Sequence, residues 1–454
     1  MPKHADPERE LVIDEQPKAG TEPALQLPQT DDVSLLGRVF PRTFVDVAAI
    51  AFVFAVCLIG TTAPQGLGYG RFDTRAAACY DDATYYKLQA DVTANNTFCA
   101  VFSYPYRLVE PVLSSRIVPW VAYGVHQLGQ WYFIRQAQLA HDRGEIQWVT
   151  QEQLGKLSGS DRALALTPNK YAKQMFALNV GMVLLKFVQS QLFYSGLASD
   201  VPEWTALGSV ALWILFAMVV QMPSRGLFFG YWKNFDYECI GDTLANVLQS
   251  RDFIRFTRRY HGYGISFGTT YNFWYHPMEG SPGFVLGYLY QLCMIVQSSF
   301  LFHPNHRNKL WTLLLELGVV PHSAVIGIFF ANGQSGAPFM FSFGFAFAFV
   351  TTQMHGFDLT RAQKWAFALG YFASLVLTYI IAGRSLSHVT EVFRMSMNFT
   401  FAPFAWVIWC ALSLVTYPSR TLVSKYPTLA GVAWFMAFIA MIAWFVWLGP
   451  TGGR

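Results

Sequence analysis

Ionisable side chains gather in the second half of this chain, within a strongly apolar sequence. Histidine and glutamate recur there as His261, His276, Glu279, His303, His306, Glu316, His322, His355, His388 and Glu391. An imidazole can bind a metal or exchange a proton near neutral pH, and a carboxylate beside it can orient the ring. Because an ionisable group in a hydrocarbon interior is costly, groups placed there are candidates for function.

Three of the histidines suggest a metal centre. His303 and His306 would share one face of a helix that begins at Pro304, since proline is favoured in a first turn. That spacing can supply two ligands to one metal, and His355 is expected on the same side of the membrane. We predict that His303, His306 and His355 bind a transition metal, iron or zinc. The alternative is a polar cap at the membrane interface.

Four further residues are candidates for acid–base catalysis. His276 and Glu279 precede Gly-Ser-Pro-Gly, so we expect a turn that lets the carboxylate orient the imidazole. An ordinary interfacial turn with a capping glutamate would look the same. Glu316 and His322 lie six positions apart in one apolar run, about 120° apart around a helix. They could serve one small site only if Pro321 bends that helix.

Two ionisable residues lie in earlier apolar runs. Lys186 is a candidate partner for Glu316, because a glutamate deep in a membrane must be neutral, paired or next to a polar cavity. His126 is the second ionisable residue that lies within an earlier apolar run.

The elements that must position these residues are predicted to be membrane helices. The 454 residues are 53% hydrophobic and only 13% charged, whereas soluble proteins carry about 25% charged residues. This composition excludes a water-soluble enzyme and a disordered chain. A net charge of +4 is too weak to favour nucleic acid as a partner. Phosphate-loop, dinucleotide-binding, serine-hydrolase and zincin motifs are absent from the sequence.

Apolar runs long enough for a bilayer, about 20 residues each, recur along the chain. They cover residues 44–63, 117–134, 171–197, 204–222, 283–302, 309–331, 337–356, 365–383, 401–417 and 428–449. Residues 260–279 are poor in charge and rich in Gly, Thr and aromatic residues, which suits a helix in the bundle interior. If this segment also crosses, the basic loops of the second half face the cytoplasm with the N-terminus. We therefore predict an all-α, polytopic bundle of about 11 helices.

The remaining segments complete this topology. Residues 1–40 are predicted to be a disordered tail, and residues 41–450 one transmembrane domain with cytoplasmic loops at 135–170 and 223–259. Arg251, Arg255, Arg258 and Arg259 within the second loop predict a basic amphipathic helix at the interface. The loop 64–116 is predicted to be extracytoplasmic, closed by a Cys79–Cys99 disulfide and glycosylated at Asn95. Two free thiols are the alternative.

Three functions fit this sequence. The first is a membrane-embedded enzyme of an endomembrane or plasma membrane, acting on a lipid or isoprenoid-like substrate through the His and Glu cluster. The second is a proton- or ion-coupled transporter or channel that uses Glu316, His322 and Lys186. The third is a receptor or scaffold. The expected partners are membrane lipids and a hydrophobic small molecule.

Overall fold

The computed structural model describes residues 113–193, 196–201, 203–226, 229–230, 251–276, 282–330, 337–383 and 385–390, with Val392 and Met436. Over this part of the chain, all regular structure is helical, with ten α-helices and several short 3-10 turns. The all-α prediction is therefore confirmed for these residues.

Eight predicted spans coincide with long helices. They are α4 (Leu113–Asp142), α7 (Lys170–Phe193), α8 (Glu203–Arg225), α10 (Arg251–Tyr275), α11 (Pro282–Ser298), α12 (Lys309–Phe330), α13 (Ala337–Thr351) and α14 (Arg361–Ile381). The predicted spans at 44–63, 401–417 and 428–449 lie outside the described residues, apart from Met436. The same holds for the tail and for the loop with Cys79, Cys99 and Asn95.

By length and hydropathy alone, one described helix is able to cross a membrane, and this helix is α14. The number of membrane crossings is therefore still a prediction. No disulfide joins described residues, since the single cysteine among them, Cys293, is a buried free thiol.

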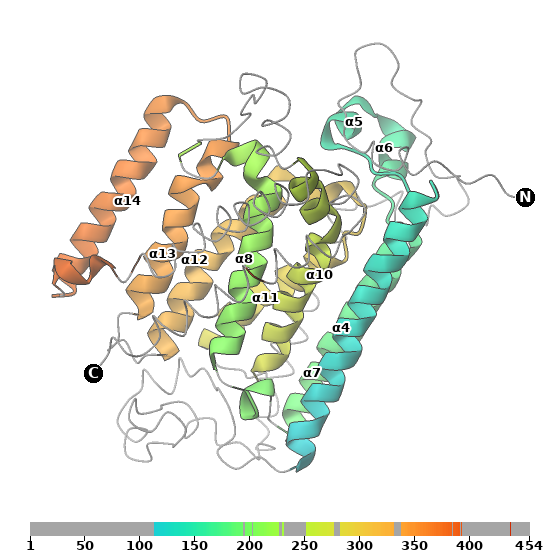
Figure 1. Ribbon diagram of the computed structural model, residues 1–454, viewed down its shortest axis with the longest axis horizontal. Helices are drawn as coiled ribbons and strands as arrows, with labels where there is room; N and C mark the ends of the chain where they lie inside the picture. The colour runs from blue at the N-terminus through green and yellow to red at the C-terminus, as the bar shows by residue number, and fades with distance from the viewer. Residues whose placement is uncertain are drawn as a thin grey trace, which may run out of the picture.

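The helices lie side by side in a broad bundle (Figure 1). Helices α4 and α7 pack together at one edge, α14 lies at the opposite edge, and α8 and α10–α13 fill the space between them. The aromatic end of α10 forms the main core, where Phe273, Trp274 and Tyr275 are almost fully buried. They pack against Tyr288 and Leu292 of α11. The prediction that residues 260–279 suit the bundle interior is therefore confirmed for residues 266–275, where most side chains are buried.

Helix α10 approaches α8 closely through glycine. A Cβ on Gly268 would lie 2.6 Å from the carbonyl oxygen of Ser209, and a Cβ on Gly264 would overlap the ring of Phe216. The two glycines are four positions apart, the spacing that lets helix backbones pack tightly in membranes. The basic segment 251–259 is helical, as predicted, and forms the first turns of α10, which continues without a break into the buried part of the helix.

Two short helices that sequence analysis missed follow α4. The predicted loop 135–170 contains the last turns of α4, then α5 (Gln151–Lys156) and α6 (Gly159–Ala165). Thr150 begins α5 with a reciprocal capping box to Gln153, which satisfies two backbone donors. Val149 and Leu154 bury only a small apolar cluster with Ala165, so the segment lacks the long apolar run that reveals a helix in sequence.

Candidate functional site

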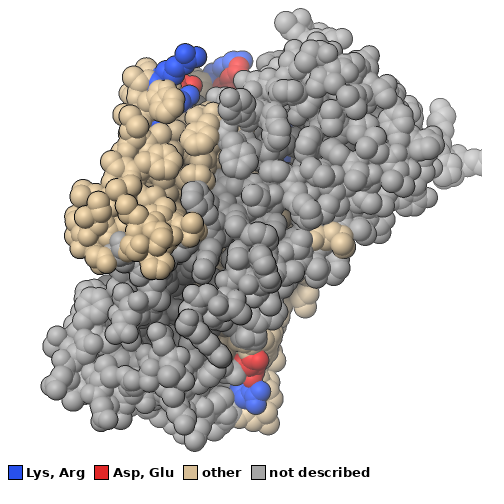
Figure 2. All heavy atoms as spheres, turned by 60° about the vertical axis from the view of Figure 1, so that its left-hand side comes forward, with Lys and Arg blue, Asp and Glu red and all other residues tan. Residues whose placement is uncertain are grey.

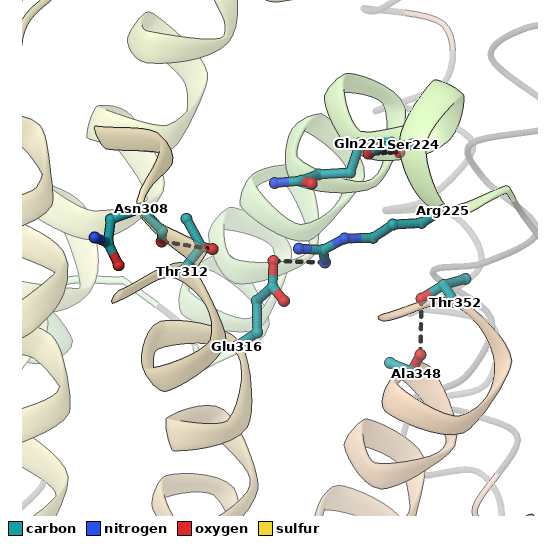
Figure 3. Close-up of polar contacts among 8 residues, drawn as sticks. All are labelled: Gln221, Ser224, Arg225, Asn308, Thr312, Glu316, Ala348 and Thr352. Carbon is teal, nitrogen blue, oxygen red and sulfur yellow. Dashed lines mark hydrogen bonds and ion pairs between the residues drawn. The ribbon is translucent and has the colours of Figure 1, made fainter. Parts of the chain in front are cut away.

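A buried ion pair joins α8 to α12. Arg225 Nη1 donates to Glu316 Oε1 over 2.6 Å, and the two side chains are only 11% and 15% exposed. Figure 3 shows the guanidinium and the carboxylate pointing toward each other from their two helices. Lys186 was the partner expected for Glu316, and that interpretation is wrong: the counter-ion is the arginine that ends α8.

The pair faces a cavity of about 60 Å³ between α8, α12 and α13. This volume holds a few water molecules. Apolar side chains form most of its wall, and the polar residues that line it are Gln221, Arg225, Glu316, Thr352 and Gln353. A site with apolar walls and a few converging polar groups has the general form of a binding or transfer site.

Local sequence explains how the pair is held. Asn308, Thr312 and Glu316 are spaced four apart, so they form one polar stripe on α12; Thr312 donates to the Asn308 carbonyl over 3.0 Å. Gly356 lets the Arg225 side chain pass, because a Cβ there would lie 2.8 Å from Arg225 Cγ. Backbone contact continues beyond α8, where the Phe229 amide donates to the Thr351 carbonyl.

His322 lies on another side of α12 from Glu316. Helix α12 runs through Pro321 without interruption, so the two side chains keep the angular separation that the sequence predicts. Tyr290 of α11 connects them. Its ring centre lies 4.9 Å from that of His322, and a Cβ added to Gly318 of α12 would lie 2.9 Å from Tyr290 Cδ2, so the Tyr290 ring packs on α12 between the two positions.

Lys186 forms the far end of this group. It is fully buried, its ammonium lies 4.9 Å from the ring centre of Trp274, and within the described residues no hydrogen-bond acceptor reaches it. Positive charge on Lys186 or on His322 would act on the imidazole of His276. The structure thus places three residues, from α7, α12 and the bend that follows α10, in one part of the bundle.

A hydrogen-bonded network extends from Trp274 to α4 and α7. The Trp274 indole donates to His126 Nδ1 over 3.1 Å, and His126 Nε2 lies 3.0 Å from Asn179 Oδ1. Gln130 donates to the same Asn179 oxygen over 2.8 Å. Asn179 in turn donates to Ser299 of the segment after α11. These buried polar groups satisfy one another, so the network fixes the relative positions of four helices.

The proposed metal ligands have other partners. His303 Nδ1 accepts from the Asn305 amide over 3.1 Å and Nε2 donates to the Leu166 carbonyl over 2.9 Å, so neither ring nitrogen keeps a lone pair for a metal. The Trp311 indole donates to Gln297 Oε1. The amide nitrogen of Gln297 therefore faces His306 Nδ1, at 3.1 Å.

The three histidines are also not convergent. His306 lies against His261, with ring centres 5.8 Å apart, whereas His355 packs against Phe229 and Gly230. Among the residues that the structure describes, no group of three or more His, Cys, Asp or Glu side chains could hold a metal ion. His388 is exposed on a short turn, and Glu279 and Glu391 lie outside the described residues.

Several residues of the site escaped sequence analysis. Arg225 lies within the predicted cytoplasmic loop 223–259, so the sequence gives no reason to place it inside the bundle. Gln130, Asn179 and Tyr290 carry no charge, so a search for ionisable groups passes over them. A weak signal was present: Gln130 and Asn179 are amides inside apolar runs, where a polar group needs a partner.

Comparisons with protein-family models, curated proteins and solved structures find no significant match to this chain.

The His306 imidazole predicts a pH-dependent stability. Burial is the main cause that lowers the pKa of His306 to about 3, and the neighbouring His261, Arg307 and His303 lower it further; the pKa is about 6.5 in an unfolded chain. Between these values the unfolded chain binds a proton that the folded chain does not. Stability is therefore complete above pH 6.5 and falls with decreasing pH, by about 1–2 kcal/mol at pH 5.

Denaturant unfolding of the detergent-solubilised protein at pH 7 and pH 5 measures this loss. The His306→Gln variant should lose less stability than the wild type over the same interval. An identical pH dependence in the two proteins would contradict the assignment.

Proposed function

We propose that this chain is a multi-pass membrane protein that conducts protons through the interior of its helix bundle. The observation that carries this proposal is the row of proton-exchanging side chains between the Arg225–Glu316 pair and Lys186. They are Glu316, Tyr290, His322, His276 and Lys186; the ring centres of Tyr290 and His322 are 4.9 Å apart, and the charges of Lys186 and His322 act on His276. Chains of carboxylate, imidazole and amine groups inside a membrane are typical of proton pathways.

The depths of these groups support a path rather than a single site. At 1.5 Å per residue, Glu316 is about 10 Å from the start of α12 at Lys309, and His322 is about 20 Å from it. Lys186 is about 24 Å along α7 from Lys170. Asn169, next to Lys170, donates to the carbonyl of Leu301, so both helices begin at the same end of the bundle. Glu316, His322 and Lys186 therefore lie at depths from about 10 to about 24 Å below that end of the bundle.

Proton flux into liposomes tests the proposal. Purified protein is reconstituted with a pH-sensitive dye inside the vesicles, and a pH gradient is applied. We expect flux above that of protein-free liposomes, reduced at least about tenfold (about 1.4 kcal/mol in barrier) by Glu316→Gln, which cannot exchange a proton. Glu152→Gln, the same change at an exposed position on α5, should leave the flux unchanged.

Tyr290→Phe serves as a second test if Glu316→Gln does not fold, because it removes only the hydroxyl next to Glu316. Flux no greater than in protein-free liposomes would overturn the proposal. Equal proton flux in the wild type and in both folded variants would show that Glu316 and Tyr290 are not part of the proton path.

An enzyme acting on a lipid or isoprenoid-like substrate is the second candidate. One observation favours it: an apolar groove lies between α12, α13 and α14, on a different face of α12 from the Glu316 cavity. A substrate in that groove would have to extend around α12 to reach Glu316 or His322. Turnover of an added lipid that is lost in Glu316→Gln, without any proton flux, would favour the enzyme.

A further inference from the structure

A groove of about 500 Å³ runs along α14, where it meets α12 and α13. This volume is within the range of small-molecule sites, about 300–1,000 Å³. Apolar side chains from all three helices line most of it, among them Leu317, Val320, Phe349, Ala366, Phe367 and Tyr371. The Tyr371 hydroxyl donates to the Phe343 carbonyl over 3.0 Å, so it does not add a free polar group to the wall.

Helix α14 presents an apolar surface beside the groove. It buries Ala368, Tyr371, Leu375 and Tyr379 and leaves large apolar side chains exposed on its other sides. The exposed set includes Trp365, Leu369, Phe372, Leu377 and Ile381. Figure 2 shows this part of the molecule as an almost uncharged surface, with basic and acidic side chains gathered at one end. Such a surface is suited to hydrocarbon and not to water.

The charged end of α14 lies just before the groove. Arg361 and Lys364 are in the first turn of the helix, and Asp358 precedes it. Lys364 is one turn before Phe367 and Ala368, on the side of the helix that continues to Tyr371. Trp365 beside them is typical of the membrane–water interface. This end therefore carries a net positive charge where a lipid headgroup would lie.

We propose that this groove binds an acyl chain of an anionic phospholipid, with its phosphate on Lys364. Along the helix, Gly370 is about 9 Å below Lys364, a depth suited to the upper part of an acyl chain beneath its phosphate. A Cβ added to Gly370 would meet no atom within 4 Å, so there is free space beside that residue. Charge complementarity favours an anionic headgroup over a zwitterionic one.

This proposal rests on the membrane location proposed above but not on proton conduction. A negative result for lipid binding and a negative result for proton flux are therefore distinguishable. The test uses delipidated full-length protein in detergent, to which phosphatidylglycerol or phosphatidylcholine is added. Native mass spectrometry counts bound lipids, and the thermal midpoint reports stabilisation. We expect phosphatidylglycerol to bind at least fivefold more tightly than phosphatidylcholine at one saturable site.

Two variants distinguish binding of the lipid acyl chain from recognition of the lipid headgroup. Gly370→Leu fills the groove and should abolish the saturable site for both lipids, whereas Lys364→Gln should remove only the preference for phosphatidylglycerol. Gly124→Leu is the matched control, because a Cβ there also meets open space but lies on α4; it should bind like the wild type. If Gly370→Leu does not fold, Ser374→Leu fills the same groove.

An unchanged saturable site in the folded groove variant would overturn the proposal. So would an unchanged headgroup preference in Lys364→Gln, which would indicate that lipids bind the apolar surface without a defined site.

Discussion

Replacing Glu316 with leucine is expected to cost about 3–5 kcal/mol of unfolding free energy, because Arg225 would remain buried without its carboxylate. The cost of an unpaired buried charge is much larger than the net contribution of the pair. The double variant Glu316→Leu/Arg225→Met should therefore recover most of the lost stability. Denaturant unfolding in detergent of the two single variants and the double variant measures this coupling.

An exposed ion pair provides the control for this cycle. Arg143 and Glu145 are joined through their side chains, which are 52% and 54% exposed, and water solvates both groups when either partner is removed. Glu145→Gln should leave stability nearly unchanged. If the unfolding free energy lost in the double variant equalled the sum of the losses in the two single variants, Arg225 and Glu316 would not interact in the folded protein.

Gly268→Ala is expected to separate α10 from α8. The added Cβ would lie 2.6 Å from the carbonyl oxygen of Ser209 and 3.0 Å from Trp213 Cβ. The first contact is with backbone, which cannot rotate away, so the helices must move apart. We expect a loss of about 1–3 kcal/mol, the usual cost of overpacking, together with a lower thermal midpoint.

A glycine-to-alanine substitution on α7 should have the opposite effect on stability. Gly181 lies within the helix and a Cβ there meets no atom within 4 Å, so Gly181→Ala should stabilise the protein by about 0.5–1 kcal/mol through helix propensity. Equal effects of the two substitutions would mean that helix propensity decides both, and that α8 and α10 are not packed closely at Gly268.

The positions of the helices could be predicted from sequence, because they depend on properties that run along the chain. The apolar run at 309–331 becomes α12, and the weaker pattern at 260–279 becomes the buried end of α10. Length, apolar content and breaks at proline or glycine are visible in any such segment. Helices α5 and α6 lacked these signals, since α5 depends on its capping box and the two helices share only a small apolar cluster.

The candidate site could be predicted only in part. Glu316, His322 and Lys186 were identified because ionisable residues in an apolar run are conspicuous. Their partners were not: sequence analysis paired Glu316 with Lys186, whereas the carboxylate binds Arg225, 91 positions away along the chain. The same reasoning placed His303 and His306 together as metal ligands, although each imidazole is held by a different protein partner.

Sequence by itself determined that the part of the chain the structure describes consists mainly of long helices, most of them apolar, with a few ionisable groups within them. Tertiary structure decided which of these groups meet. The physical reason is that the rotation and depth of one helix relative to another are set by how the helices pack, as where Gly268 of α10 meets Ser209 of α8 and where Gly356 meets the Arg225 side chain. Neither quantity is encoded in the periodicity of a single helix, so only the folded bundle places Arg225 opposite Glu316 and Lys186 near His276.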